Sequence, residues 1–180
     1  SSVGGNLTLV SGHVNGITDD GNVTVGGNFT ATTDANSGAI SLGTMLVDGT
    51  VSLNTNGTGD ATIVNDNGLE FTTSDVNGDL SATATAGSIT QSGNLEVALT
   101  SSFTTSATNA MITLNTNTNN LAGGVTLSTT GSTGHATIDN HTNALEIDTS
   151  SVGGNLTLTA GANITDDGNV TVGGNFTATT

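Results

Sequence analysis

The chain repeats its own opening after nearly 150 residues. Ser2–Leu9 recurs as Ser151–Leu158, and Ile17–Thr33 recurs without a single change as Ile164–Thr180. The offsets are 149 and 147 residues, because the segment that joins the two blocks is two residues longer in the first copy. Such a fixed period is typical of repeat architectures, in which small length differences fall in loops. We therefore interpret residues 1–180 as one solenoid segment in which residues 1–33 match residues 150–180.

A shorter unit lies within the long repeat and begins with an apolar residue after a turn signal such as Asp-Gly-Asn or Asn-Gly. Gly49–Ile63 resembles Gly124–Ile138, so three units of unequal length are followed by three similar ones. Units of 18–30 residues are too short for a propeller blade and favour a solenoid. The expected coil starts lie near Val23, Val51, Leu69, Leu95, Val125, Leu145 and Val170.

The local pattern predicts strands. Val23–Val25, Leu69–Phe71 and Leu145–Ile147 each place a polar residue between two apolar ones, the period of a strand with one buried face. Proline is absent from the sequence, so no ladder hydrogen-bond donor is missing. We expect an all-β, parallel β-helix of about seven coils with no cap at either end. Six coils per 147-residue repeat would give a rod of about 29 Å at the usual strand spacing of ~4.8 Å.

Charge narrows the choice of partners. The sequence has no Lys or Arg against 15 Asp and Glu residues, which gives a formal net charge of −15. Proteins hold nucleic-acid phosphates mainly through Lys and Arg, so we expect no nucleic-acid partner. No apolar run approaches the ~20 residues of a membrane-spanning helix, so we expect no membrane insertion. Cysteine is also absent, which excludes disulfides and thiol catalysis.

The segment Ser151–Ala178 resembles the repeat region of giant bacterial surface proteins of the filamentous haemagglutinin type. Val125–Gly131 and Ala144–Ser151 are similar to the units that alternate with it in such repeats. The resemblance covers essentially the whole chain. It implies a right-handed β-helix within a long secreted fibre at the cell surface, exported by an outer-membrane partner.

Calcium is the cofactor that the sequence makes worth testing, because hard cations prefer clustered oxygen ligands and a solenoid stacks its turns. The candidate ligands are Asp19, Asp20, Asp66, Asp75, Asp79, Asp166 and Asp167. None of their turns matches the glycine-rich nonapeptide of calcium-binding β-rolls. The alternative interpretation is that these aspartates form turns through their side chains.

The sequence offers no convincing catalytic constellation, so we expect a protein that is not an enzyme. The preferred hypothesis is a structural fibre segment whose partner is itself, through consecutive repeats, end-to-end stacking and lateral association. The alternative is an adhesive module that recognises a glycan or another surface, with ice binding as a further variant. Ice binding would require flat rows of Thr-x-Thr triplets such as Thr30–Thr32, Thr83–Thr85 and Thr116–Thr118.

Overall fold

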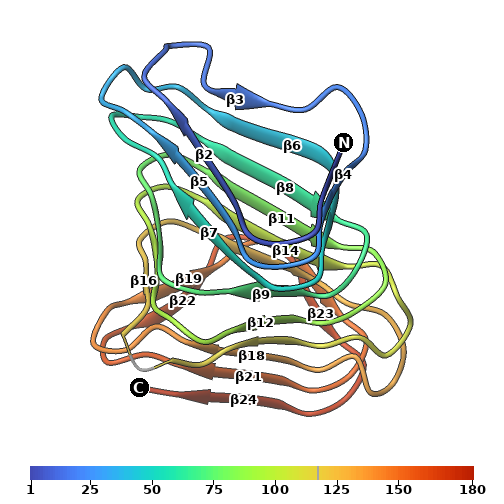
Figure 1. Cartoon of the computed structure of the whole chain (residues 1–180). Helices are drawn as coiled ribbons and strands as arrows, with labels where there is room; N and C mark the ends of the chain where they lie inside the picture. The colour runs from blue at the N-terminus through green and yellow to red at the C-terminus, as the bar shows by residue number, and fades with distance from the viewer. Residues whose placement is uncertain (117) are drawn as a thin grey trace.

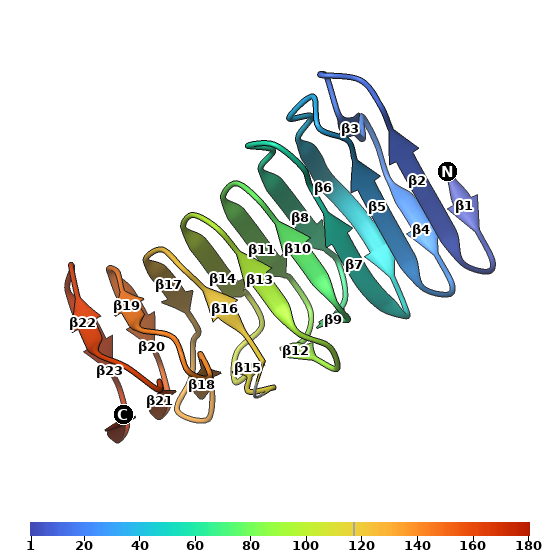
Figure 2. The same cartoon turned by 90° about the vertical axis from the view of Figure 1, so that its left-hand side faces the viewer.

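The computed structural model describes residues 1–116 and 118–180, which form a solenoid of parallel β-strands (Figure 1). These residues contain 24 strands and no helix, so none of them forms an apolar helix that could cross a membrane. Each strand pairs in parallel with a strand one coil away, as the stacked rungs in Figure 2 show. The predicted all-β parallel β-helix is therefore confirmed. The Thr116–Thr118 triplet lies partly outside the described residues.

The strands form two sheets of 12 strands each. The first sheet contains β1 (Ser2–Val3), β3 (Ile17–Thr18), β4 (Val23–Val25), β6 (Ile40–Val47), β8 (Ala61–Asn65), β11 (Leu80–Ala84), β14 (Ser101–Thr105), β17 (Val125–Ser128), β19 (Leu145–Ile147), β20 (Ser150–Val152), β22 (Ile164–Asp166) and β23 (Val170–Val172). The second contains β2 (Leu7–Ser11), β5 (Phe29–Thr33), β7 (Thr50–Asn54), β9 (Leu69–Phe71), β10 (Ser74–Val76), β12 (Ile89–Gln91), β13 (Leu95–Val97), β15 (Ile112–Leu114), β16 (Asn120–Leu121), β18 (Ala136–Asp139), β21 (Leu156–Thr159) and β24 (Phe176–Thr179).

The coils are more even than the sequence spacing suggested. The ladder β2-β5-β7-β9-β12-β15-β18-β21-β24 places seven steps between β5 and β24, which are equivalent segments of the long repeat. Each coil therefore takes one seventh of that repeat. The hydrogen bond between Asp79 and Thr100, which crosses one step, agrees with this because the two residues are 21 positions apart. The estimate of six coils per long repeat was one too low. The expected coil starts lie at or next to the starts of strands in both sheets, so their spacing does not follow one side of the coil. Seven steps of ~4.8 Å correspond to about 34 Å.

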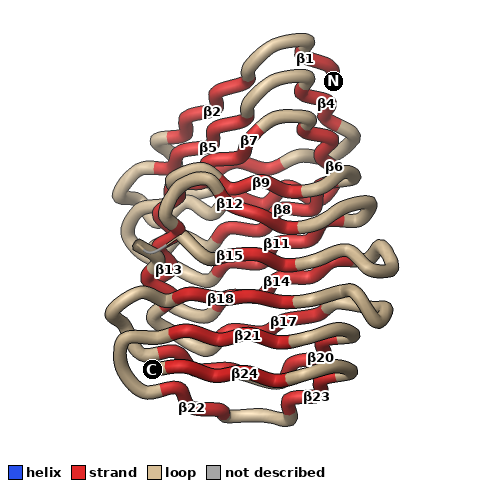
Figure 3. The backbone as a smooth tube through the Cα atoms, turned by 90° about the horizontal axis from the view of Figure 1, so that it is seen from below, coloured by secondary structure: helices blue, strands red, loops and turns tan. Residues whose placement is uncertain are grey.

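The core lies between the two sheets and consists of inward-facing side chains stacked coil upon coil. Phe29 pairs in register with Val51, and Val51 pairs with Phe71, all three fully buried. The intervening residues Thr30 and Ser52 point outward. Alternation along each strand therefore produces apolar rows inside and hydroxyl rows outside, and Figure 3 shows the loops gathered at the edges of the stack.

Most coils have unequal sides, whereas the consecutive strands β7 and β8, and likewise β17 and β18, place single strands on both sides. One side is a single strand of four or five residues, such as β5 or β11, and the opposite side is divided into two short strands, such as β9 and β10. In β6 the two short strands are fused, with a register shift between Leu42 and Met45 where the chain changes direction. We call these the single-strand side and the two-strand side.

The two sides exchange sheets along the rod. The sequence of β8, which begins at Ala61, matches that of β18, which begins at Ala136, yet β8 lies in the first sheet and β18 in the second. In the same way, β7 and its counterpart β17 lie in opposite sheets. The separation of these segments is half of the long repeat, or about three and a half coils, so equivalent segments face opposite directions. After a full long repeat the original sheet returns, and β2 and β21 both belong to the second sheet.

Candidate functional site

The seven aspartates considered as calcium ligands are distributed along the rod. Asp20, Asp66, Asp75, Asp79, Asp166 and Asp167 are exposed, whereas Asp19 is half-buried. Asp75 pairs in register with Glu96 on the outer face of the second sheet, which places two carboxylates on adjacent coils. Among residues 1–116 and 118–180, no group of three or more His, Asp or Glu side chains is arranged to hold a metal ion. Calcium binding therefore stays a prediction without a preformed cage.

The Asp19 carboxylate accepts hydrogen bonds from the fused strand β6. Its carboxylate accepts hydrogen bonds from the backbone N–H of Gly43 at 2.8 Å and of Thr44 at 2.9 Å, and from the Thr44 hydroxyl at 2.8 Å. These donors lie where the register of β6 shifts. Burial raises the pKa of the Asp19 carboxyl, but the hydrogen bonds from Gly43 and Thr44 outweigh it and lower the pKa below its ordinary value.

Asp79 belongs to a column of side chains that joins successive coils at one edge of the rod. The backbone N–H of Asp79 donates to Oδ1 of Asp60 at 2.9 Å, and the N–H of Thr100 donates to Oδ1 of Asp79 at 2.9 Å. The Thr100 hydroxyl donates to the same oxygen at 2.7 Å. Each acceptor thus binds the equivalent residue of the following coil, so these carboxylates join successive coils.

The same arrangement recurs in two other columns. Oδ1 of Asn6 accepts the N–H of Asn28 at 2.9 Å, and Oδ1 of Asn28 accepts the N–H of Thr50 at 3.0 Å. Towards the C-terminus the acceptors are His135 Nδ1 and then Asn155 Oδ1, which take the N–H groups of Asn155 and Asn175 at 2.8 Å. All three columns run in one direction, from a side-chain acceptor to a backbone donor one coil later.

Buried asparagines mark the places where the sides exchange sheets. Asn65, fully buried, accepts the N–H of Val47 at 2.8 Å and donates to the Val47 carbonyl at 3.1 Å. Asn140 is the counterpart of Asn65 in the other half of the repeat, is also fully buried, and makes the same pair of bonds with Leu121 at 2.7 and 3.1 Å. Each side-chain amide therefore replaces the strand that would otherwise continue the ladder beyond Val47 or Leu121.

Two buried serines complete these exchanges. The Ser74 hydroxyl accepts the N–H of Leu53 at 3.1 Å, and the Ser150 hydroxyl accepts the N–H of Leu127 at 2.9 Å. Leu53 and Leu127 lie in β7 and β17, each of which is followed in the ladder by a two-strand side. The serines satisfy backbone donors that face the break between the two short strands.

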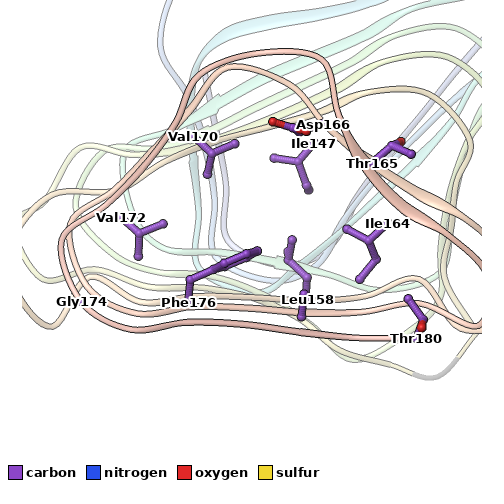
Figure 4. Close-up of a pocket in the computed structure, with 11 residues that line it drawn as sticks. Ile147, Leu158, Ile164, Thr165, Asp166, Val170, Val172, Gly174, Phe176 and Thr180 are labelled. Atoms are coloured by element: carbon purple, nitrogen blue, oxygen red, sulfur yellow. The ribbon is translucent and has the colours of Figure 1, made fainter.

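A hollow lies at the open C-terminal end of the core. Ile164, Val170, Val172, Phe176 and Ala178 line it, and Figure 4 shows the apolar side chains converging on the space inside the last coil. Its lining is mainly apolar, with Thr165, Asp166 and Thr180 as polar residues.

The repeat is also found by comparison with known families. The chain matches the family described as repeats of unknown function (DUF5649) over residues 58–128 and 133–180, which together make up about two thirds of its length. The chain belongs to this family. The two matches begin at residues 58 and 133, a separation that equals the one between equivalent segments in opposite sheets. No curated protein and no solved structure matches the chain.

Sequence reasoning did not find the residues that join the coils. Asn6, Asn28, Asp60 and His135 carry the columns, and Asn65 and Asn140 carry the exchanges. A signal for the first group was the recurring Gly-Gly-Asn turn at Asn6 and Asn28, and a single preceding glycine at Asp60 and His135. The signal for the second was the recurrence of Ala-Thr-Ile followed two residues later by Asn, at Ala61–Asn65 and Ala136–Asn140.

Proposed function

We propose that the chain is a non-catalytic structural segment of a long β-solenoid fibre at the cell surface or outside the cell, where it provides reach and stiffness. The supporting observation is the stack of hydrogen-bonded coils, reinforced at its edges by side-chain columns that connect each coil to the next. Nearest-neighbour stacking of this kind can be extended to any number of repeats. The resemblance to filamentous haemagglutinin-type repeats supports the surface location.

Imaging of intact cells that produce the protein tests this function. Gold-labelled antibodies against the chain are expected to decorate thin rods outside the cell, and external protease is expected to remove the label. Labelling that occurs only after the cells are permeabilised would contradict the proposed location.

Recognition of a glycan, of ice or of another surface is a second candidate, favoured by the hydroxyl rows. Thr62, Ser81, Ser102 and Thr126 follow one another in register on the outer face of the first sheet. A glycan panel and an ice-growth assay test this candidate by comparing the chain with its Ser102→Asp variant. Binding that the substitution abolishes would assign the row a recognition function, and the absence of binding by the parent chain would leave the structural function alone.

Calcium has a different role in this proposal, since it would bridge carboxylates of neighbouring fibres and reduce the repulsion caused by a net charge of −15. Adding calcium is then expected to increase the sedimentation coefficient of concentrated fibres while leaving the melting temperature of the dilute chain unchanged. A large calcium-dependent rise in melting temperature at dilute concentration would instead indicate a site within one rod.

A further inference from the structure

Some asparagines of the chain stand directly before a glycine. There are four of them: Asn15, Asn56, Asn67 and Asn77. Asparagine is a chemically labile residue. A following glycine makes it more reactive, because glycine has no Cβ to shield its backbone nitrogen from the amide carbon Cγ of the asparagine. The contacts that the fold imposes on each pair then decide which of the four can react.

In two of the pairs the side-chain amide already contacts the following backbone nitrogen. Oδ1 of Asn67 accepts the N–H of Gly68 at 2.9 Å, and Oδ1 of Asn56 accepts the N–H of Gly57 at 3.0 Å. Both asparagines are exposed, so each amide is free to turn its Cγ towards the nitrogen. Reacting groups that are held in contact need little further ordering to react.

In the other two pairs the fold holds one of the reacting groups in a different contact. The N–H of Gly16, which follows Asn15, donates to the carbonyl of His13 at 2.8 Å. The half-buried Asn77 is held by Thr55, whose carbonyl accepts Nδ2 of Asn77 at 2.7 Å and whose hydroxyl accepts its N–H at 2.9 Å. A reaction at either pair has to break these hydrogen bonds first.

We propose that Asn56 and Asn67 are sites of spontaneous self-modification, at which each asparagine is converted into aspartate or isoaspartate. The backbone nitrogen of the following glycine forms a bond to Cγ, the Cγ–Nδ2 bond breaks, and ammonia leaves with the proton that the nitrogen has lost. Water then adds to either carbonyl carbon of the resulting succinimide and opens the ring. Nothing is oxidised or reduced, and the chain gains one carboxylate at each site.

The other half of the long repeat supplies a matched comparison for Asn67. Asn143 and Ala144 stand before β19 as Asn67 and Gly68 stand before β9. Nδ2 of Asn143 donates to the carbonyl of Asn119 at 3.1 Å, and the Cβ of Ala144 shields the backbone nitrogen. The same corner of the coil is therefore modified in one half-repeat and preserved in the other.

Modification of Asn67 changes a contact with the preceding coil. Nδ2 of Asn67 donates to Oδ1 of Asp48 over a long distance of 3.4 Å. Conversion replaces this donor with a carboxylate that faces Asp48, and like charges repel each other. Isoaspartate also adds one carbon atom to the backbone just before Leu69, whose N–H donates to the carbonyl of Ser88 at 2.9 Å. The corner between β8 and β9 therefore weakens as the chain ages.

Peptide mapping of the unaltered protein tests the proposal. The folded chain and the chain unfolded in urea are incubated at neutral pH, and a protease that cleaves before aspartate then separates the four asparagines into peptides 1–18, 48–59, 66–74 and 75–78. Mass spectrometry measures the conversion of each asparagine. A methyltransferase specific for isoaspartate labels that product independently.

Folding is expected to affect the four asparagines differently. Asn56 and Asn67 should keep rates within about threefold of those in the unfolded chain, whereas Asn15 and Asn77 should slow at least about 10-fold. An equal effect of folding on all four asparagines would overturn the proposal. Conversion of Asn143 in the folded chain as fast as that of Asn67 would overturn it as well.

Asn67→Asp imitates one product and tests its effect on the corner. The melting temperature is expected to fall, with a loss at least about twice as large at low salt as at high salt, because the new carboxylate faces Asp48. In the Asp48→Asn background the same substitution is expected to have a much smaller effect. A loss of equal size in both backgrounds would contradict the proposed repulsion.

Discussion

At the scale of single residues, the glycine before a column residue is needed for space, rather than for an unusual backbone angle, wherever another coil lies beneath it. A Cβ atom on Gly27 would meet the Oδ1 atom of Asn6 and the backbone of Gly5, which belong to the coil beneath. Gly5 occupies the same place in the Gly-Gly-Asn turn, but an added Cβ there meets nothing within 4 Å. The motif therefore records close approach between coils.

The pair Gly27 and Gly5 provides a matched test of this explanation. Gly27→Ala is expected to destabilise the chain by about 1–3 kcal/mol, the usual cost of overpacking a well-packed site. Gly5→Ala is expected to change the free energy of unfolding by less than about 0.5 kcal/mol, as is usual for surface sites. Urea denaturation of both variants measures the difference. Equal effects would show that the glycines are required for chain flexibility in the turn.

Asp19 gives the chain a pH-dependent contact. Its pKa is lowered in the folded state by the Gly43 and Thr44 donors. A carboxyl with a depressed folded pKa contributes stability that is present above its unfolded pKa near 4 and is lost as the pH falls through the folded value. Asp19→Asn is therefore expected to lower the melting temperature at pH 7 and to have a much smaller effect near pH 2. A difference that is the same at both pH values would exclude the charged contact as the cause.

At the scale of strands, the exchange of sides depends on the buried asparagines. Removing the Asn65 amide leaves the N–H and the carbonyl of Val47 without these partners in a buried position. Asn65→Ala is expected to destabilise the chain by about 2–4 kcal/mol, because an unsatisfied buried polar group costs about 1–3 kcal/mol. The half-buried Asn54, whose amide donates to the Ser52 hydroxyl, supplies the control variant.

The two exchanges lie half a long repeat apart, and Asn65 and Asn140 bind different strands. The double variant is therefore expected to lose the sum of the two single losses, as distant sites usually do. Denaturant melts of the single and double variants measure this sum. A double variant no less stable than either single variant would mean that one substitution already abolishes the contribution of both exchanges.

The strands themselves were predictable, whereas their assignment to a sheet was not. Alternation in Leu69–Phe71 and Leu145–Ile147 identifies both segments as strands with one buried face, and β9 and β19 confirm it. The sequences are nearly the same, however, and the two strands lie in opposite sheets. Periodicity reports only which side chains are buried. The sheet to which a strand belongs depends on the number of half-coils that precede it in the chain. Counting turn signals gave the wrong number of coils.

The candidate site was predictable in part for a similar reason. Asp79 and Asp19 were recognised as turn carboxylates, but their acceptor roles depend on Thr100 and Gly43, each of which lies one coil further along the chain. The fully buried asparagine Asn65 would be assigned to a turn by composition alone. Contacts between successive coils require the register, and the register becomes known only when the coils are stacked.

At the scale of the whole molecule, the number of coils predicts the length of a fibre. Each long repeat contributes seven steps, or about 34 Å at the usual strand spacing. Electron microscopy or small-angle X-ray scattering on proteins with increasing numbers of consecutive long repeats is expected to give this increment. An increment shorter by one strand spacing would indicate six coils per unit and would contradict the ladder described above.

The exchange of sides every three and a half coils has a mechanical consequence. A rod whose coils always placed the divided side in the same direction would have two unlike flanks, and any difference in their spacing would accumulate into a bend. In this chain the single-strand and two-strand sides exchange sheets after half a long repeat. A bend that begins in one half-repeat is therefore followed by a bend in the opposite direction. Successive half-repeats thereby oppose each other's curvature, and a fibre built from an even number of them should run straight.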